Sequence, residues 1–365
     1  MKNKSTQSEP EPTMFKTIRN DIRQGDFRRS VKREFKELKE SMLNEQRQKR
    51  LTHMSRIQKW FYVPWWLLKS LFLKLTPVRR LLLVIGVLFL SVNINAAAGR
   101  VNINFQLLGT LLILFVLMLE LKDKLLAQSE LEAGRAIQQA LMPDRAPNVP
   151  GWNLWLFTRS ANEVGGDLVD FVQIDNTRFG VALGDIAGKG LSAALVTAKL
   201  QATLRALVPY FTSLAELGNK LNHVFCRDCL KNIFASLVYL DCLSDSGVVR
   251  ILNAGHIPPL LVRGSQIEEM IKGGMALGIA PDASFIEQQV ELEKGDFILV
   301  YSDGVTEARN ENGEFFGDAQ LFELILKITN LPTGEMGEQI VAAVERFMGE
   351  AKTHDDLSIA LLRRA

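Results

Sequence analysis

The stretch EVGGDLVDFVQI (residues 163–174) places two glycines directly before Asp167 and a second carboxylate, Asp170, three residues later. Adjacent glycines let the backbone turn tightly and come close to a ligand, which a packed core does not require. An aspartate beside glycine is also an ordinary turn signal. The function of Asp167 therefore depends on whether other carboxylates meet it in the folded chain.

Three later segments, FGVALGDIAGKG, DFILVYSDGVTEARN and THDDLSIALL, also place carboxylates beside apolar runs of strand length and composition. The aspartates concerned are Asp185, Asp303, Asp355 and Asp356. One such aspartate could be a simple turn residue. Their repetition within one C-terminal region instead indicates a shared site at the ends of several strands.

Carboxylates that are brought together repel one another and take up protons unless a cation compensates for their charge. Hard divalent cations such as Mg²⁺ and Mn²⁺ prefer oxygen ligands. The histidines His256 and His354 are isolated, and we expect them to have structural or indirect roles. The cysteines, Cys226, Cys229 and Cys242, form neither a disulfide framework nor a zinc-binding pattern. The residues thus predict an oxygen-ligated site for divalent cations in a reduced compartment.

The sequence does not match the common motifs for nucleotide binding or for serine hydrolases. The segment GDIAGKGLS has three residues between Gly184 and Gly188, and Gly190 rather than serine or threonine follows Lys189, so it is not a P-loop. No G-x-G-x-x-G opens a helix after a strand, and no G-x-S-x-G is present. The sequence therefore gives no sign of a P-loop NTPase, a dinucleotide-binding domain or a serine hydrolase.

Charge is distributed unevenly along the 365 residues. Residues 1–80 contain 20 Lys/Arg and 8 Asp/Glu, whereas the remainder contains 23 Lys/Arg and 33 Asp/Glu. A helix of mixed charge is expected within residues 31–59. Such a basic head suits an anionic lipid surface, and we find no recognition motif for nucleic acid.

Two uncharged stretches of 19 residues, 81–99 and 101–119, are each about long enough to cross the hydrocarbon core as a helix. Arg100 is the only charged residue between them. Residues 60–75 place aromatic side chains beside spaced lysines, a composition typical of the membrane–water boundary. We expect a two-helix transmembrane hairpin, the alternative being a buried helical hairpin in a soluble domain.

The flanks of this hairpin predict its orientation. Arg79 and Arg80 precede the first stretch, and Lys122 and Lys124 follow the second. Lysine and arginine prefer the cytoplasmic side of a membrane. We therefore expect a two-span protein of the inner, cytoplasmic membrane, with the N-terminus and the C-terminal domain both in the cytoplasm.

A helix is expected to continue the second span through residues 120–142, where apolar residues recur at helical spacing and prolines follow. Such a linker helix suits a signalling rod or a dimer interface. Farther along, helices are expected at residues 190–208, 213–230, 318–329 and 334–351, and strands at 234–241 and 248–253. The pattern Ser213-x-x-Glu216 is a capping box, which marks the start of the second of these helices.

Taken together, these segments resemble the RsbU/SpoIIE-type branch of the PPM family of metal-dependent protein serine/threonine phosphatases. The pieces AIQQALMP, EVGGDLVDF, GDIAGKGLSAAL, LNAGHIPPLL, LGI, GDFILVYSDGVTEARN and DDLSIALL stand in the family's order. The resemblance covers residues 127–364. It implies an α+β fold, an αββα sandwich of two antiparallel sheets flanked by helices, and the strands and helices expected from the residues agree with it.

The resemblance also implies two Mn²⁺ or Mg²⁺ ions bound at the edge of the sheets. By their positions in the family's motifs, the ligands would be Asp167, Asp185, Asp303, Asp355 and the backbone carbonyl of Ile186. Asp167 would bridge both ions. The role of Asp356 is left open between a third-metal ligand and an indirect one, and no phosphate-binding arginine can be identified.

We thus expect a basic cytoplasmic or interfacial segment (1–76), a transmembrane hairpin (77–121), a linker helix (122–147) and a PPM-type phosphatase domain (148–365). The expected activity is a phosphoric monoester hydrolase acting on phosphoserine or phosphothreonine. By resemblance, its substrate is a phosphorylated anti-anti-sigma-like regulator in a partner-switching pathway. Membrane lipids and a second copy of the chain, through the linker helix, are the other expected partners.

Two alternatives stay open. One is a catalytically inactive pseudophosphatase that acts as a membrane-bound binding module. The other is a two-metal enzyme acting on a different phosphoester, such as a diester. Retention of all four carboxylates argues against the first alternative, and the order of the motifs argues against the second.

Overall fold

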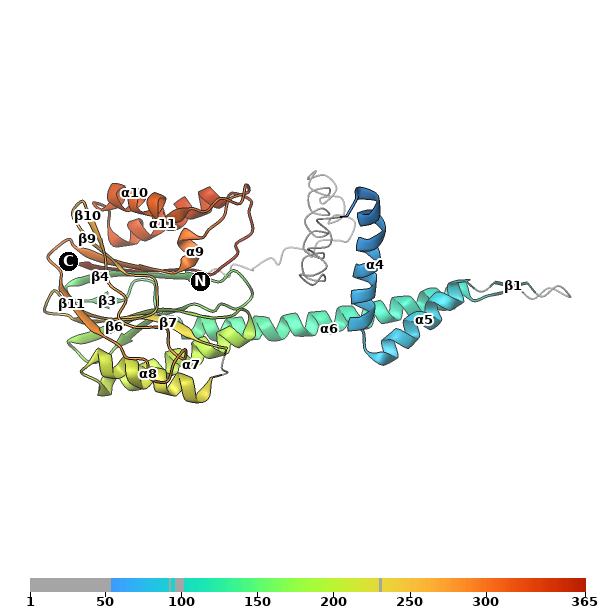
Figure 1. Cartoon of the computed structure of the whole chain (residues 1–365), viewed down its shortest axis with the longest axis horizontal. Helices are drawn as coiled ribbons and strands as arrows, with labels where there is room; N and C mark the ends of the chain where they lie inside the picture. The colour runs from blue at the N-terminus through green and yellow to red at the C-terminus, as the bar shows by residue number, and fades with distance from the viewer. Residues whose placement is uncertain (1–53, 92, 96–101, 230–231) are drawn as a thin grey trace, which may run out of the picture. The chain divides into compact units, whose positions relative to one another are not determined.

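The computed structural model describes residues 54–91, 93–95, 102–229 and 232–365 (Figure 1). Most of the expected helix at residues 31–59 and the loop at Arg100 lie outside the described residues. The chain divides into two compact units, Met1–Lys124 and Leu125–Ala365.

Unit 2 contains two antiparallel sheets that face one another. The six-stranded sheet has the order β10-β9-β12-β13-β4-β3, and the five-stranded sheet has the order β11-β8-β7-β6-β5. The strands are β3 (Asn148–Val149), β4 (Trp152–Arg159), β5 (Leu168–Gln173), β6 (Arg178–Ile186), β7 (Ala235–Leu243), β8 (Val248–Ala254), β9 (Leu260–Arg263), β10 (Gln266–Glu269), β11 (Glu287–Glu291), β12 (Phe297–Tyr301) and β13 (Leu357–Arg364). The predicted pair of antiparallel sheets is confirmed.

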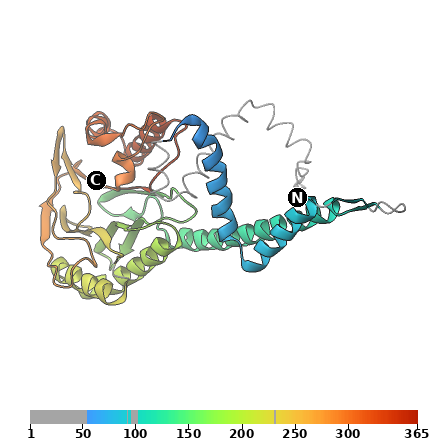
Figure 2. The same cartoon turned by 45° about the vertical axis from the view of Figure 1, so that its right-hand side comes forward.

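Helices cover the outer face of each sheet, which gives four layers in the order αββα (Figure 2). Helices α7 (Leu191–Leu207) and α8 (Leu214–Asp228) pack on the five-stranded sheet. Helices α10 (Gly317–Ile328) and α11 (Thr333–Met348) pack on the six-stranded sheet. Each sheet is therefore buried on both faces.

Burial on both faces explains why the central strands read as continuous apolar runs. In β6, Val181 and Leu183 belong to the core between the two sheets, whereas Ala182 belongs to the core beneath α7 and α8. Alternate side chains of one strand thus enter two different cores. The apolar run of the segment DFILVYSDGVTEARN forms β12, as its strand-like composition indicated. The predicted start of α8 is confirmed, because the Ser213 side chain accepts a hydrogen bond from the Glu216 backbone amide.

Unit 1 contains α4 (Arg56–Lys74), α5 (Pro77–Ser91), β1 (Asn93–Asn95), β2 (Asn102–Asn104) and the beginning of α6 (Gln106–Leu141). Helices α5 and α6 approach closely at two glycines. A Cβ atom built on Gly109 would lie 2.6 Å from the carbonyl oxygen of Gly86. Small residues at such crossings are typical of helix pairs within membranes.

The predicted ends of the two spans were wrong. Helix α5 ends at Ser91 rather than near residue 99, and α6 begins at Gln106 rather than at residue 101. Between them, Asn93–Asn95 pairs in antiparallel register with Asn102–Asn104. Asparagine competes for backbone hydrogen bonds and disfavours helix, so these residues shorten both helices. The predicted continuity of the second span with the linker helix is confirmed, because α6 runs unbroken to Leu141.

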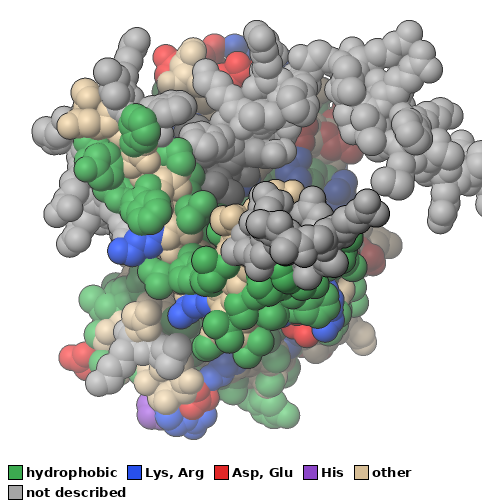
Figure 3. Space-filling view, turned by 90° about the vertical axis from the view of Figure 1, so that its right-hand side faces the viewer, with side chains coloured by type: hydrophobic (Ala, Val, Ile, Leu, Met, Phe, Trp, Pro, Cys, Tyr) green, Lys and Arg blue, Asp and Glu red, His purple; other side chains and the backbone are tan. Residues whose placement is uncertain are grey.

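Within the described residues, one helical stretch has both the length and the apolar composition of a membrane span, and it is Leu191–Tyr210. This stretch comprises α7 and the short helix η1 (Val208–Tyr210), which belong to the layer covering the five-stranded sheet. Helix α5 has 15 residues. Hydrophobic side chains are nevertheless exposed along α5 and the first half of α6, and exposed hydrophobic side chains are visible in Figure 3.

Candidate metal centre

The structure brings the four predicted aspartates to one edge, where the two sheets meet. Asp167 directly precedes β5, and Asp185 lies next to the last residue of β6. Leu168 of β5 pairs with Gly184 of β6 in antiparallel register. The next residue toward the edge is therefore Asp167 before β5 and Asp185 on β6. Asp303 follows β12 as the first residue of the short helix α9 (Asp303–Thr306), and Asp355 precedes β13.

The proximity of these carboxylates changes their acidity. Burial, followed by the charge of Asp185, raises the pKa of Asp167 well above its ordinary value. Burial, followed by the charges of Asp303 and Asp355, raises the pKa of Asp185 to about 7. The pKa of Asp303 is also raised, first by burial and then by Asp355. Without a compensating cation, the cluster therefore retains protons at pH values where isolated carboxyl groups are ionised.

A buried oxygen with no partner lies at the centre of this cluster. Asp167 is 6% exposed, and its Oδ2 atom has no hydrogen-bond partner among the described residues. Buried polar atoms are normally satisfied, and an orphan atom calls for an explanation such as an ion. An all-oxygen donor set with raised pKa values fits Mg²⁺ or Mn²⁺.

The side chains do not, however, form a ready-made cage. Among the described residues, no three acidic, histidine or cysteine side chains converge closely enough to hold a metal ion. The assignment of Asp167, Asp185, Asp303, Asp355 and the Ile186 carbonyl as ligands therefore stays a prediction. What the structure adds is the location of these groups at one shared edge.

The first of the two glycines in the opening stretch, Gly165, is required for space. A Cβ atom on Gly165 would lie 2.7 Å from Oδ2 of Asp356. A Cβ atom on Gly166 would lie 3.5 Å from the carbonyl oxygen of Ile186 and 3.7 Å from Oδ1 of Asp185. Gly165 thus permits close approach to Asp356, whereas a side chain at Gly166 would make only ordinary van der Waals contacts with these groups.

Asp356 holds the segment that carries Asp167. Its Oδ1 accepts a hydrogen bond from the amide of Ala161 at 2.7 Å, and its Oδ2 accepts from the amides of Gly166 at 2.6 Å and Asp167 at 3.2 Å. Asp356 is 7% exposed. This side chain therefore positions the backbone of the site, a role that the sequence left open.

The end of helix α6 contacts the same segment. The amide nitrogen of the Gln138 side chain donates to the carbonyl of Gly165 at 2.9 Å, and the amide of Gly165 donates back to Gln138 Oε1 at 3.1 Å. This reciprocal pair fixes Gly165 from the side of the linker helix. This contact cannot be predicted from the sequence, because a single glutamine in a helix carries no local pattern.

A second connection explains the other carboxylate of the opening stretch. Asp170 is fully buried and pairs with Arg205 of α7 through contacts of 2.8 and 2.6 Å. Arg205 also donates to the carbonyl of Leu141 at 3.3 Å, and Gln201 donates to the same carbonyl at 2.9 Å. The C-terminal end of α6 is thus tied through α7 to strand β5.

Lys189 is the cation that lines the acidic cleft. Its Nζ lies 3.0 Å from Oδ2 of Asp355 and 2.9 Å from the carbonyl of His354. The cleft is lined by Asn162, Val164, Gly166, Asp185, Gly188, Lys189, Gly190, Asp355 and Asp356. From the sequence alone Lys189 has no assigned role, because it stands in the segment GDIAGKGLS, whose spacing excludes a P-loop.

His256 has the structural role expected of it. His256 is 3% exposed and does not line the acidic cleft. Its backbone amide donates to Oδ1 of Asn253, and its ring nitrogen Nδ1 lies 3.1 Å from the Ile257 carbonyl oxygen. Burial lowers the pKa of His256 to about 4. The three cysteines are free thiols.

Two facing antiparallel sheets lie between helical layers and bring aspartates of both sheets to one edge. The comparisons with known proteins identify a domain of this kind as a metal-dependent protein serine/threonine phosphatase of PP2C type. The family model described as Stage II sporulation protein E (SpoIIE) matches residues 175–365, just over half of the chain. The chain belongs to the SpoIIE family.

The relatives agree with this membership. Phosphoserine phosphatase RsbU of Bacillus subtilis is 28% identical over 239 residues, which cover 65% of this chain and 70% of RsbU. Phosphoserine phosphatase RsbP of the same organism is 24% identical over 238 residues, covering 64% of this chain and 57% of RsbP. Protein IcfG of Synechocystis is 27% identical, and the match covers 54% of this chain but only 35% of IcfG.

Solved structures share the fold. The SiaA-PP2C domain of Pseudomonas aeruginosa superposes with a TM-score of 0.58 at 20% identity, covering 66% of this chain and 98% of that domain. The RsbU and RsbW domains of Rv1364c from Mycobacterium tuberculosis give a TM-score of 0.54 at 24% identity, covering 62% of this chain and 63% of that one. These likenesses concern the fold of the C-terminal domain.

The raised pKa of Asp185 leads to a prediction for the metal-free protein. Because the folded pKa of about 7 exceeds the ordinary value of 3.8, the protein loses stability as the pH rises through this interval. Asp185→Asn removes the repelling charge and should stabilise the EDTA-treated protein above about pH 7, with little difference below about pH 4. Thermal unfolding across this range measures the difference, and Mn²⁺ should raise the Tm of the wild type only.

Asp228→Asn is the matched control. Its carboxylate is exposed, and hydrogen bonds from Arg227 and then Lys199 lower its pKa. This substitution should leave the response to Mn²⁺ intact and should not stabilise the protein at high pH. Equal pH profiles for the wild type and Asp185→Asn would contradict the electrostatic account of the cluster.

Proposed function

We propose that this chain is a membrane-anchored phosphoserine/phosphothreonine protein phosphatase whose substrate is a phosphorylated anti-anti-sigma-like regulator of a partner-switching pathway. The observation that carries the proposal is the meeting of Asp167, Asp185, Asp303 and Asp355 at one sheet edge. Membership of the SpoIIE family supports the reaction, and the names of RsbU and RsbP support the choice of phosphoserine.

Two bound Mg²⁺ or Mn²⁺ ions would supply an activated water and offset the charge of the phosphoryl oxygens. The four aspartates and the Ile186 carbonyl would hold them. Asp356 and Gln138 keep the Gly165–Gly166 backbone in place for this purpose. Lys189 is exposed at the rim of the cleft, where its ammonium group would pair with a substrate phosphoryl oxygen.

Membrane attachment rests on the composition and packing of unit 1. Exposed apolar side chains line α5 and the first half of α6, and exposed Phe61 and Trp65 stand on α4. Arg79 pairs with Glu120 and Asp123 at 2.6 Å, which links the base of α5 to α6. Basic flanks favour a cytoplasmic location for both ends of this hairpin. We place the phosphatase domain on the cytoplasmic face of the inner membrane.

Regulation through the linker helix follows from its contacts within unit 2. Gln138 and the Leu141 carbonyl connect α6 to the metal-site segment and to β5 through Arg205. Exposed Leu125 and Ile137 on the same helix offer an apolar surface to a second copy of the chain. A signal that shifts or pairs α6 would thereby alter the position of Gly165.

Hydrolysis assays on the full chain in lipid nanodiscs test the proposed reaction. We expect Mn²⁺-dependent release of phosphate from a phosphoserine peptide and from an aryl phosphate monoester, but not cleavage of a phosphodiester. Asp167→Asn should lower kcat by about 10²-fold or more, because it removes charge stabilisation at the reacting centre. Lys189→Ala should mainly raise KM, and Lys189→Arg should restore much of the loss.

The alternatives give different outcomes in the same assays. A folded, Mn²⁺-binding protein that cleaves none of the three substrates would favour the pseudophosphatase. Cleavage of the diester in preference to the monoesters would favour the other two-metal enzyme. Either result would overturn the proposed reaction.

The contact of Gln138 with Gly165 yields a prediction for metal affinity. Gln138→Leu removes both hydrogen bonds while keeping the size of the side chain, so the apparent Kd for Mn²⁺ should rise by about tenfold. Titration of Mn²⁺ against activity and against Tm measures it. Gln139→Leu, an exposed change on the same helix, is the control and should match the wild type. Equal Mn²⁺ affinities for the two variants would contradict the role of α6.

A further inference from the structure

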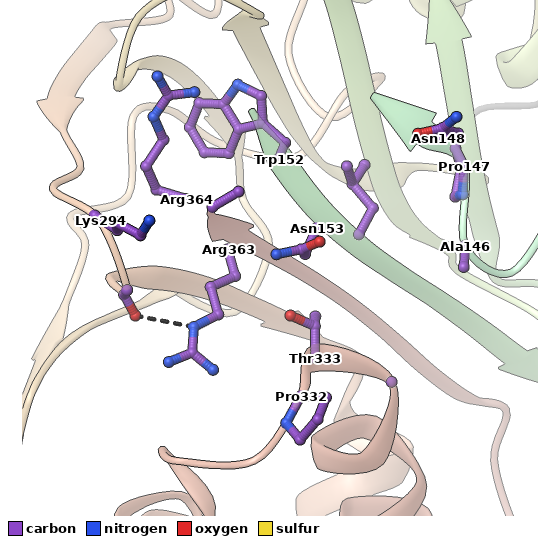
Figure 4. Close-up of a pocket in the computed structure, with 14 residues that line it drawn as sticks. Ala146, Pro147, Asn148, Trp152, Asn153, Lys294, Pro332, Thr333, Arg363 and Arg364 are labelled. Carbon is purple, nitrogen blue, oxygen red and sulfur yellow. Dashed lines mark hydrogen bonds between the residues drawn. The ribbon is translucent and has the colours of Figure 1, made fainter. Parts of the chain in front are cut away.

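A second hollow of about 570 Å³ lies in unit 2, away from the acidic cleft (Figure 4). It shares no lining residue with that cleft. The hollow adjoins the start of β4 and the end of β13, whereas the acidic cleft adjoins the opposite ends of these strands. At about 3.3 Å per residue, the eight-residue strand β13 separates the two by roughly 20–25 Å.

The lining of this hollow is basic. Lys294, Arg363 and Arg364 contribute to it, and none of its lining residues is an aspartate or glutamate. Arg363 is held in place, because its Nε donates to the Gly295 carbonyl at 3.1 Å and its Nη1 donates to the Leu331 carbonyl at 2.8 Å. Arg364 is engaged differently, with its guanidinium 5.1 Å from the centre of the Trp152 ring. The fixed positive charge therefore comes from Arg363, and Lys294 adds a mobile one.

The N-terminus of α11 opens onto the same hollow. Pro332, Thr333 and Gly334 line it, and the N-cap residue Pro332 provides no side-chain hydrogen bond to the first turn. The first amide groups of a helix lack partners within the helix, and the helix dipole adds partial positive charge there. This end of the 16-residue helix carries one acidic side chain, exposed Glu335, in its first turn, but Glu335 does not line the hollow. The amide groups that face the hollow are thus suited to an anion.

An independent observation comes from Thr333. Its side chain is buried, with 6% of the residue exposed, and its hydroxyl has no hydrogen-bond partner among the described residues. Figure 4 shows this hydroxyl turned toward the side chains of Asn153 and Arg363. Buried hydroxyl groups are normally satisfied, so a donor left without a partner beside a basic wall points to a ligand oxygen.

We propose that this hollow is a binding site for a small organic phosphate, separate from the catalytic centre. Its phosphoryl group would lie against the first turn of α11, with Thr333 and Arg363 as donors and Lys294 as a further cation. The volume exceeds the need of a bare ion and falls in the range of small-molecule sites. Pro147, Leu154 and Pro332 supply apolar surface for the organic part.

Binding of phenyl phosphate and of inorganic phosphate to the full chain in nanodiscs tests the proposal. EDTA is present throughout, so that a metal-loaded catalytic centre cannot bind or hydrolyse the probe. Calorimetric titration should give saturable binding, with phenyl phosphate binding more tightly than inorganic phosphate. Lys294→Ala, an exposed change that should not affect folding, should weaken binding by at least about threefold and reduce its dependence on salt.

Thr333→Val separates a ligand site from a mere packing defect. It keeps the shape of the side chain and removes the unpartnered hydroxyl, so it should raise the Tm of the phosphate-free protein and weaken phosphate binding by about tenfold. Thr203→Val is the control, because the Thr203 hydroxyl is already bonded to the Lys199 carbonyl at 2.7 Å. That control should leave phosphate affinity unchanged.

Three results would overturn the proposal. The first is the absence of saturable binding to the wild type at millimolar phenyl phosphate. The second is equal affinity of the wild type, Thr333→Val and Lys294→Ala, which would place the bound phosphate elsewhere. The third is equal or weaker binding of phenyl phosphate than of inorganic phosphate, which would exclude an organic phosphate as the ligand.

Discussion

The repulsion among carboxylates at one sheet edge is the constraint on which the rest of this domain depends. Two sheets, each buried on both faces, bring Asp167 and Asp185 from one side and Asp303 and Asp355 from the other. Without a cation, their mutual charge and burial raise the pKa values of Asp167, Asp185 and Asp303. The fold thus holds together charged groups that would otherwise separate. A site for divalent cations requires such an arrangement of carboxylates.

The backbone around Asp167 is held by contacts rather than by regular structure. Asp356 accepts hydrogen bonds from three amides of the preceding loop, and Gln138 exchanges two hydrogen bonds with Gly165. Because Gln138 belongs to the linker helix, the geometry of the candidate metal centre depends on a helix outside the sandwich. This dependence gives a physical route by which an event at the N-terminal half of the chain could alter activity.

Much of the domain follows from sequence because its signals are local. Apolar runs such as Phe297–Tyr301 define strands, and aspartates at their ends define the shared edge. The contacts of Asp356, Gln138 and Lys189 could not be foreseen in the same way, since each joins residues far apart in the chain. The ends of α5 and α6 differ from the prediction, which rested on hydrophobicity alone. Asparagines disfavour helix, and Asn93 and Asn95 follow the end of α5 while Asn102 and Asn104 precede the start of α6.

Anomalous diffraction at the manganese edge, from crystals of the full chain grown with Mn²⁺, tests the central claim most directly. We predict two manganese peaks at the shared sheet edge, bound by oxygens of Asp167, Asp185, Asp303 and Asp355. Ordered crystals without manganese at this edge, or with manganese bound only by residues outside the four aspartates, would contradict it.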